Sequence, residues 1–335
     1  MIQPLLKKVL AKRLKSLQYE SGLFSASSKN VQTGYNVAWI RDNIYEALGL
    51  EHAEEMGAAV KTYHALFDVF RKHEWKLDLA LQKKPDFAFE YIHPRYNPHT
   101  FEELHEPWGN KQNDAIGMFL FKVGELYQKG IVVFRNEQDM RILQKLVYYL
   151  ASIEYWHDRD NGVWEENEEV HASSVGACVA GLKAISWIVN VPKVLIAKGE
   201  ETLNTLLPWE SETKEVDLAL LSLIYPFNVV NDTQRAQILW NVEKKLVRRM
   251  GIIRYPGDRY YSNGREAEWC FGFPWLAKIY KDMGNLDKSK YYMNLTLGTM
   301  NKRLEIPELY YAHTNKHNKN SPLGWASAMY IVAAS

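Results

Sequence analysis

The 335-residue chain lacks the features that mark several large protein classes. It has only two cysteines, Cys178 and Cys270, both in apolar surroundings, which fits a reducing compartment and predicts a cytoplasmic protein. No apolar stretch reaches the ~20 residues that a membrane span requires, since Lys183 interrupts the best candidate at 174–191. The net charge is only +1, and no Lys/Arg tract alternates with aromatic residues, so nucleic acid is not an expected partner.

Several chemical signatures are also absent. No glycine-rich phosphate loop follows a predicted strand. His313 and His317 are four residues apart but lie in an Asn-rich loop without a Cys or acidic partner at ligand spacing, so we expect no metal site. Ser173-Ser174 lacks the strand-to-helix turn of a hydrolase nucleophile. We therefore expect a chemistry that uses protein side chains and no cofactor.

The dominant hydrophobic period is 3.6 residues, and few Val/Ile alternations occur, so a sheet-based fold is not expected. Only 252–255 resembles a strand. Asp232 and Ser321 are candidate N-caps, and Pro226 and Gly284 mark helix exits. Helices are predicted at 3–18, 41–57, 58–74, 111–129, 136–154, 171–189, 192–206, 215–225, 231–247, 274–283, 286–303 and 322–334.

Two kinds of predicted helix alternate along the chain. Those at 136–154 and 231–247 are strongly amphipathic, whereas 115–123, 172–189 and 216–225 are apolar on most faces and must be enclosed by other helices. An inner ring of buried helices inside an outer amphipathic ring satisfies both patterns. This predicts an all-α (α/α)6 barrel in one catalytic domain, 1–335. An α-solenoid is the alternative, but no motif repeats at a fixed period.

The segment 1–19 is predicted to form a basic amphipathic helix, with apolar residues from Leu5 to Leu17 beside five basic residues between Lys7 and Lys15. We expect no signal peptide here, because the charges run through the apolar positions. The helix either packs on the barrel as an outer element or lies on an anionic membrane. We favour packing on the barrel because outer helices of this kind are common.

Five predicted connections, 19–38, 85–110, 155–170, 250–273 and 304–320, exceed the usual loop length. They contain aromatic and charged residues in place of Ser/Gly filler, which argues against disorder. Exposed rings suit the flat faces of sugars, although each ring alternatively closes the core. Because every second helix connection is long, the long loops should share one face of the barrel, and that face should carry the site.

Carboxylates beside tryptophans are the candidate catalytic groups. Glu165 follows Trp164 and precedes Glu166, so an apolar wall and a nearby negative charge can keep one carboxyl protonated. Glu308 follows Pro307 between apolar residues. The bland alternatives are a solvated acidic turn at 165–166 and a salt-bridged surface carboxylate at 308.

Arg41 and Asp42 open a predicted helix. Asp42 either interacts favourably with the helix dipole or accepts hydrogen bonds from the hydroxyls of a sugar to which Arg41 donates.

These segments, in this order, resemble glycoside hydrolase family 15, the glucoamylases, and the related phosphorylase kinase α and β regulatory subunits. The resemblance covers about residues 35 to 330, and its strength lies in the order of eight short motifs. They are Ala38-Trp-Ile-Arg-Asp42, Trp108-Gly-Asn-Lys-Gln-Asn-Asp114, Gly162-Val-Trp-Glu-Glu166, Asp217-Leu-Ala-Leu-Leu-Ser222, Arg254-Tyr-Pro-Gly-Asp258, Gly272-Phe-Pro-Trp275, Ile306-Pro-Glu308 and Pro322-Leu-Gly-Trp325.

The resemblance implies a role for each matching residue. Glu165 matches the general acid and Glu308 the general base, while Trp108 matches a tryptophan that flanks the acid. The remaining matches concern substrate: Arg41, Asp42 and Arg254 match residues that bind the non-reducing glucose, and Glu166, Trp164 and Trp275 fall where further substrate contacts are expected. The family fold is the (α/α)6 barrel.

The implied function is an inverting, exo-acting hydrolase that releases glucose from α-glucosides. Maltooligosaccharides are the default substrate, and trehalose and isomaltose-type glucosides are alternatives that depend on loops 85–107 and 309–320. The absence of a β-sandwich and of a starch-binding module favours soluble oligosaccharides or disaccharides. The segments 170–176 and 307–311 resemble the kinase subunits more closely, so a non-catalytic glucan-binding or regulatory module is the main alternative. A helical scaffold for protein partners is a third.

Overall fold

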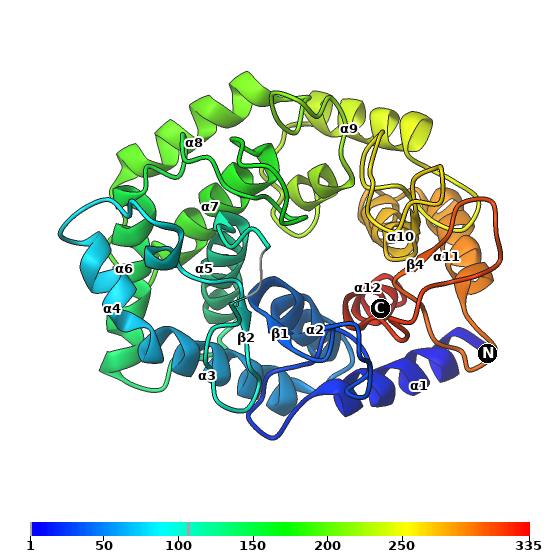
Figure 1. Cartoon of the computed structure of the whole chain (residues 1–335), viewed down its shortest axis with the longest axis horizontal. Coiled ribbons are helices and arrows are strands. Elements are labelled where there is room, and N and C mark those ends of the chain that lie inside the picture. Colours follow the sequence, from blue (N-terminus) through cyan, green and yellow to red (C-terminus); the bar gives the residue numbers. More distant parts are fainter. Residues whose placement is uncertain (1, 106–107) are drawn as a thin grey trace.

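The computed structural model describes residues 2–105 and 108–335. Figure 1 shows its helices as two concentric rings seen end-on. The inner ring consists of α2 (Ile40–His52), α5 (Asn113–Gln128), α7 (Ala172–Ile185), the 3-10 helix η2 (Leu218–Leu223), α10 (Gly272–Asp282) and α12 (Gly324–Ala333). Each inner element contacts the next, and α12 contacts α2, so the ring is closed.

The outer ring follows the same chain order. It consists of α1 (Ile2–Leu17), α3 (Met56–Lys72), α4 (Glu74–Ala80) with α6 (Glu137–Ser152), α8 (Lys193–Leu206), α9 (Asp232–Lys245) and α11 (Leu286–Thr299). Apart from the two consecutive outer helices α3 and α4, the chain alternates between outer and inner elements. The predicted (α/α)6 barrel is therefore confirmed.

Burial separates the two rings. The inner helix α7 has 12 buried residues among its 14, whereas the outer helix α8 has three, Leu195, Gly199 and Leu203. Glycines allow the inner helices to approach closely: a side chain at Gly117 of α5 or Gly181 of α7 would overlap the backbone of the facing helix. The apolar and amphipathic patterns in the sequence thus correspond to inner and outer positions.

The helix α1 packs against α12 and α2. Its leucines Leu6, Leu10, Leu14 and Leu17 are buried there, so its apolar face is already covered by the barrel. In this structure α1 therefore lies in the outer ring with its apolar face against the inner helices. Within residues 2–105 and 108–335, every helix is too short or too polar to cross a membrane.

Some local predictions were wrong. The segment 215–225 is a short 3-10 helix, α4 was not foreseen as a separate helix, and 252–255 forms only isolated bridges through Ile252 to Val247 and Trp269. The N-cap of α9 is Asn231, whose side chain accepts from the backbone N–H of Gln234, and α12 starts after Leu323. These errors concern helix ends, where neighbouring residues compete for the same free N–H groups.

The two kinds of connection differ in length. Connections from an inner to an outer element are short, such as 53–55 and 283–285, whereas those from an outer to an inner element are long. Two short antiparallel pairs brace the long ones: β1 (Ala38–Trp39) with β2 (Arg95–Tyr96), and β3 (Glu268–Trp269) with β4 (Leu309–Tyr310). The 3-10 helix η1 (Ala88–Glu90) lies in one of them. The long loops therefore meet at the N-terminal ends of the inner helices.

Candidate active site

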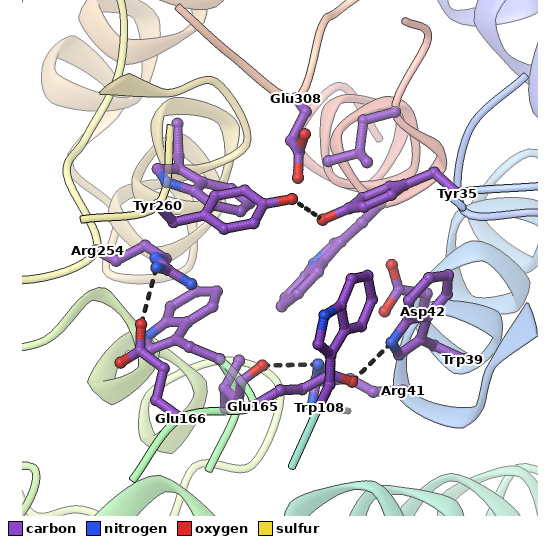
Figure 2. A pocket seen from close by; sticks show the side chains of 15 residues that line it. Tyr35, Trp39, Arg41, Asp42, Trp108, Glu165, Glu166, Arg254, Tyr260 and Glu308 are labelled. Carbon is purple, nitrogen blue, oxygen red and sulfur yellow. Dashed lines mark hydrogen bonds and ion pairs between the residues drawn. The ribbon is translucent and has the colours of Figure 1, made fainter. Parts of the chain in front are cut away.

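A cavity of about 310 Å³ lies where the long loops meet the inner helices. It contains eight of the nine residues that the sequence predicted for the site: Arg41, Asp42, Trp108, Trp164, Glu165, Glu166, Arg254 and Glu308 (Figure 2). Tyr35, Trp39, Val163, Tyr260, Trp269, Leu323 and Trp325 complete its lining. The cavity is at the lower end of the size range of small-molecule sites, about 300–1,000 Å³.

Glu165 is held by donors on one of its two oxygens. Its Oε1 accepts hydrogen bonds from Trp39 Nε1 at 2.8 Å and Gln112 Nε2 at 3.0 Å, and Arg95 Nε lies 3.8 Å away. Burial raises the pKa of Glu165, although Arg95 and Arg41 oppose this shift. The residue also has a left-handed backbone (φ 59°), which is unusual for a non-glycine residue and clusters at functional sites.

Glu308 is fully buried, and its donors are neutral. Its Oε2 accepts from the side-chain amides of Asn318 and, at 2.7 Å, Asn320, while Oε1 has no hydrogen-bond partner among the described residues. Burial raises the pKa of this carboxyl, and the hydrogen bonds from Asn320 and Asn318 oppose the shift. The hydroxyls of Tyr35 and Tyr260 lie 2.7 Å apart beside it (Figure 2).

Glu165 does not lie in a solvated turn, and Glu308 is not a surface carboxylate. The side chain of Glu165 is 13% exposed and Glu308 is 0% exposed. Figure 2 shows them on opposite sides of the cavity. Two buried carboxyls that face one cavity can exchange protons with a bound ligand and a water.

Arg41 and Asp42 begin α2 and face the cavity between the two carboxylates. Arg41 is fixed by Asp114 Oδ2 at 3.0 Å, by Gln112 Oε1 at 2.9 Å and by the carbonyl oxygen of Val163 at 2.7 Å. Burial raises the pKa of Asp42 to about 7, against the attraction of Arg41. Arg41 can donate hydrogen bonds to a polyhydroxylated ligand from a fixed position. Asp42 can accept them in its ionised form, which it reaches near neutral pH.

A second guanidinium lies on the other side of the cavity. Arg254 pairs through two nitrogens with Asp258, at 2.7 Å from Nε, and Nη2 also donates to Glu166 Oε1 at 2.9 Å. Its Cζ lies 5.3 Å from the ring centroid of Trp164. The pKa of Glu166 is lowered, because Arg254 and Lys214 outweigh the effect of its burial. Glu166 is therefore an ionised anchor for Arg254.

Trp275 does not line the cavity, whereas the sequence predicts that it contacts substrate. It is 1% exposed, donates to the carbonyl oxygen of Tyr225 at 2.8 Å, and packs behind Trp325 at a centroid distance of 5.7 Å. Trp325, from the last matching motif, takes the position that faces the cavity. The sequence shows that both residues are aromatic but not which of the two lies in front.

Other site residues were missed because nothing in the local sequence marks them. Arg95 comes from β2. Asn318 and Asn320 come from the Asn-rich loop that also contains His313 and His317. Trp108, which the sequence predicts beside the acid, lines the cavity. It is 40% exposed, and its ring centroid lies 4.4 Å from Arg95 Cζ. Within the described ranges, no group of three or more His, Cys, Asp or Glu residues could hold a metal ion.

Comparisons with known proteins agree with this architecture. A wild-type glycosidase matches with a TM-score of 0.86 at 20% identity, covering 98% of this chain and 95% of that chain. A glucoamylase from Saccharomycopsis fibuligera (TM-score 0.69, 17% identity, 99% and 94% covered) and a bacterial glucoamylase complexed with acarbose (0.73, 15%, 98% and 54%) have the same fold.

Two relatives found by sequence are regulatory subunits and not glycosidases. A probable phosphorylase b kinase regulatory subunit alpha of Caenorhabditis elegans is 28% identical over 264 residues, which are 67% of this chain and 21% of that protein. The skeletal muscle isoform of this subunit from Oryctolagus cuniculus is 25% identical over 285 residues, 73% of this chain and 23% of that protein. The chain thus spans about a fifth of the length of these relatives. The family model described as glycosyl hydrolases family 15 matches residues 5–334, and the chain belongs to this family.

Proposed function

We propose that the protein is an inverting, exo-acting glycoside hydrolase that releases glucose from the non-reducing end of α-glucosides. The observation that carries this proposal is the presence of Glu165 and Glu308 on opposite walls of one small cavity (Figure 2). Maltooligosaccharides are the default substrate, and trehalose or isomaltose-type glucosides are alternatives. The small cavity suits the end of a chain better than its middle.

In the proposed reaction the terminal glucose lies between the two carboxyls. Arg41 and Arg254 donate to its hydroxyls and Asp42 accepts, while Trp108 and Trp164 cover ring faces. Glu165 protonates the glycosidic oxygen as the bond from that oxygen to C1 breaks. Glu308 accepts a proton from a water whose oxygen bonds to C1 from the other side, which inverts the anomeric centre.

The surroundings of the two carboxyls suit these roles. Burial raises the pKa of Glu165, which favours the protonated form that an acid needs. The amides of Asn318 and Asn320 fix Oε2 of Glu308 and leave Oε1 without a partner among the described residues, so this oxygen is available to a water.

The second candidate function is a non-catalytic glucan-binding or regulatory module. The likeness to phosphorylase kinase alpha subunits favours it. Such a module would bind sugar through Arg41, Asp42 and the tryptophans without turnover.

One experiment separates the two. Purified protein is incubated with maltose, isomaltose, trehalose and maltotetraose, and the released glucose and its anomeric form are followed by NMR. Initial formation of β-glucose supports the inverting hydrolase. Binding of maltotetraose with no glucose release from any of the four supports the regulatory module.

A further inference from the structure

A groove on the outer side of the active-site loops consists of two adjoining hollows of about 460 and 540 Å³. The hollows share Val170, Thr205 and Leu206, so they form one continuous groove. It lies between α8 and the loops 153–171 and 207–217. We call it the outer groove, with Trp156 in one hollow and Trp209 in the other.

The aromatic and charged residues of the outer groove indicate what it can bind. Trp209 is 47% exposed and offers its ring to a ligand, whereas Trp156 is 5% exposed and lies under Lys198, whose Nζ is 4.2 Å from the ring centroid. Arg159, the second cation, donates to the carbonyl oxygen of Glu168. Indole surface beside polar groups suits the C–H faces and hydroxyls of sugars.

Charge argues against an anionic ligand. Lys198 and Arg159 face the acidic side chains of Glu154, Glu201 and Glu212 in the same groove, so no positive potential is left for a phosphate or a nucleotide. A neutral polyhydroxylated chain fits this balance. The combined volume of the two adjoining hollows suits several sugar units better than a single one.

One loop connects the outer groove to the surroundings of the active-site cavity. The loop 207–217 places Trp209 in the groove, while its Lys214 pairs with Glu166 at 2.8 Å in the cavity. The backbone carbonyl of Glu210 accepts from the N–H of Ala172 at 2.7 Å, which fastens this loop to α7. A chain bound in the groove is therefore held at a fixed position relative to Glu165.

We infer that the outer groove is a second, non-catalytic carbohydrate site that binds a linear α-glucan segment, with Trp209 as its main stacking surface. The site would hold a glucan near the cavity in which its chain ends are cleaved. Only the choice of an α-glucan as the ligand rests on the proposed function.

The test measures binding directly. Calorimetric titration of the Glu165→Gln variant with maltoheptaose, and separately with isomaltoheptaose, should show two sites for at least one of the two. Adding Trp209→Ala should weaken one site by about tenfold, as the loss of one ring contact implies. The matched control is Trp187→Ala, which removes a 71% exposed tryptophan outside the groove and should change neither site.

A second variant and a kinetic measurement keep the result independent of whether Trp209→Ala folds correctly. Thr205→Arg fills the floor of the groove without removing an aromatic ring and should abolish the same site, so misfolding of Trp209→Ala does not decide the outcome. In the otherwise wild-type protein, Trp209→Ala should leave kcat/KM for maltose unchanged and lower it severalfold for soluble starch. A single binding site for both oligosaccharides, or equal affinities in the Trp209→Ala and Trp187→Ala variants, overturns the inference. Absence of glucose release with two intact binding sites instead contradicts the proposed function alone.

Discussion

The two walls of the active-site cavity hold their carboxylates by different means. Glu165 lies beside the guanidinium groups of Arg95 and Arg41, whereas Glu308 is held mainly by neutral donors, among them the amides of Asn318 and Asn320. Burial raises the pKa of both carboxyls despite this difference. Desolvation is therefore the dominant influence on the pKa at both positions, and the neighbouring charges and donors reduce the size of the shift.

The roles of acid and base therefore follow from more than the direction of the pKa shift. A positively charged neighbour stabilises the carboxylate that forms when the acid gives up its proton, which suits Glu165 to the role of acid. Oε1 of Glu308 has no hydrogen-bond partner in the part of the chain that the structure describes, which suits it to contact a water.

The largest effect is expected from replacing the carboxyls themselves. Glu165→Gln and Glu308→Gln should each lower kcat on an α-glucoside by about 10²–10⁴-fold, because each removes one proton transfer. With α-glucosyl fluoride, whose leaving group needs little protonation, Glu165→Gln should recover activity and Glu308→Gln should not. Steady-state kinetics on both substrates, with circular dichroism as the folding control, checks this. Recovery by Glu308→Gln instead would exchange the two roles.

The next effect concerns the two limbs of the pH profile. Trp39→Phe removes one donor to Glu165 and should raise the pKa of this acid, so the basic limb of kcat/KM moves to higher pH. Asn320→Leu removes a donor to Glu308 and should raise the pKa of this base, so the acidic limb moves to higher pH. Shifts of about one pH unit correspond to a hydrogen bond to a charged group. Movement of the same limb in both variants would contradict the assignment.

A smaller effect distinguishes Trp325, which lines the cavity, from Trp275, which packs behind it. Trp275→Phe should destabilise the protein by about 2 kcal/mol, because it loses buried volume and the hydrogen bond to Tyr225. It should leave KM unchanged, since Trp275 does not reach the cavity. Trp325→Phe is the matched variant and should raise KM. Denaturant unfolding and kinetics on both proteins test this, and a raised KM for Trp275→Phe would return that residue to the site.

The smallest effect concerns Asp42, which lies between the walls. Its pKa is raised from 3.8 to about 7, so its ionised form is less favourable in the folded protein than in the unfolded chain. Its contribution to stability is therefore lost as the pH rises from about 4 through 7. Asp42→Asn should gain about 1–2 kcal/mol of stability relative to the original protein between pH 5 and pH 6.5. Chemical unfolding at both pH values measures this, and a difference independent of pH would show that Asp42 is ionised throughout.

Periodicity in the sequence was enough to predict the architecture. Helices that are apolar all round, such as 172–189, can lie only inside others, so the alternation along the chain predicted two rings. The long connections between helices likewise predicted the face that holds the cavity. The helix ends were less predictable, as Asn231 and Leu323 show, because adjacent residues offer similar caps.

The candidate carboxylates, the two arginines and the order of the family motifs can be read from the residues alone. The groups around them cannot, and they become visible in the folded chain: Arg95 and Gln112 at Glu165, Asn318 and Asn320 at Glu308, and Trp325 in front of Trp275. The physical reason is that a pKa and a binding contact depend on distances of a few ångströms between residues far apart in the chain. A local pattern of residue types does not contain such distances.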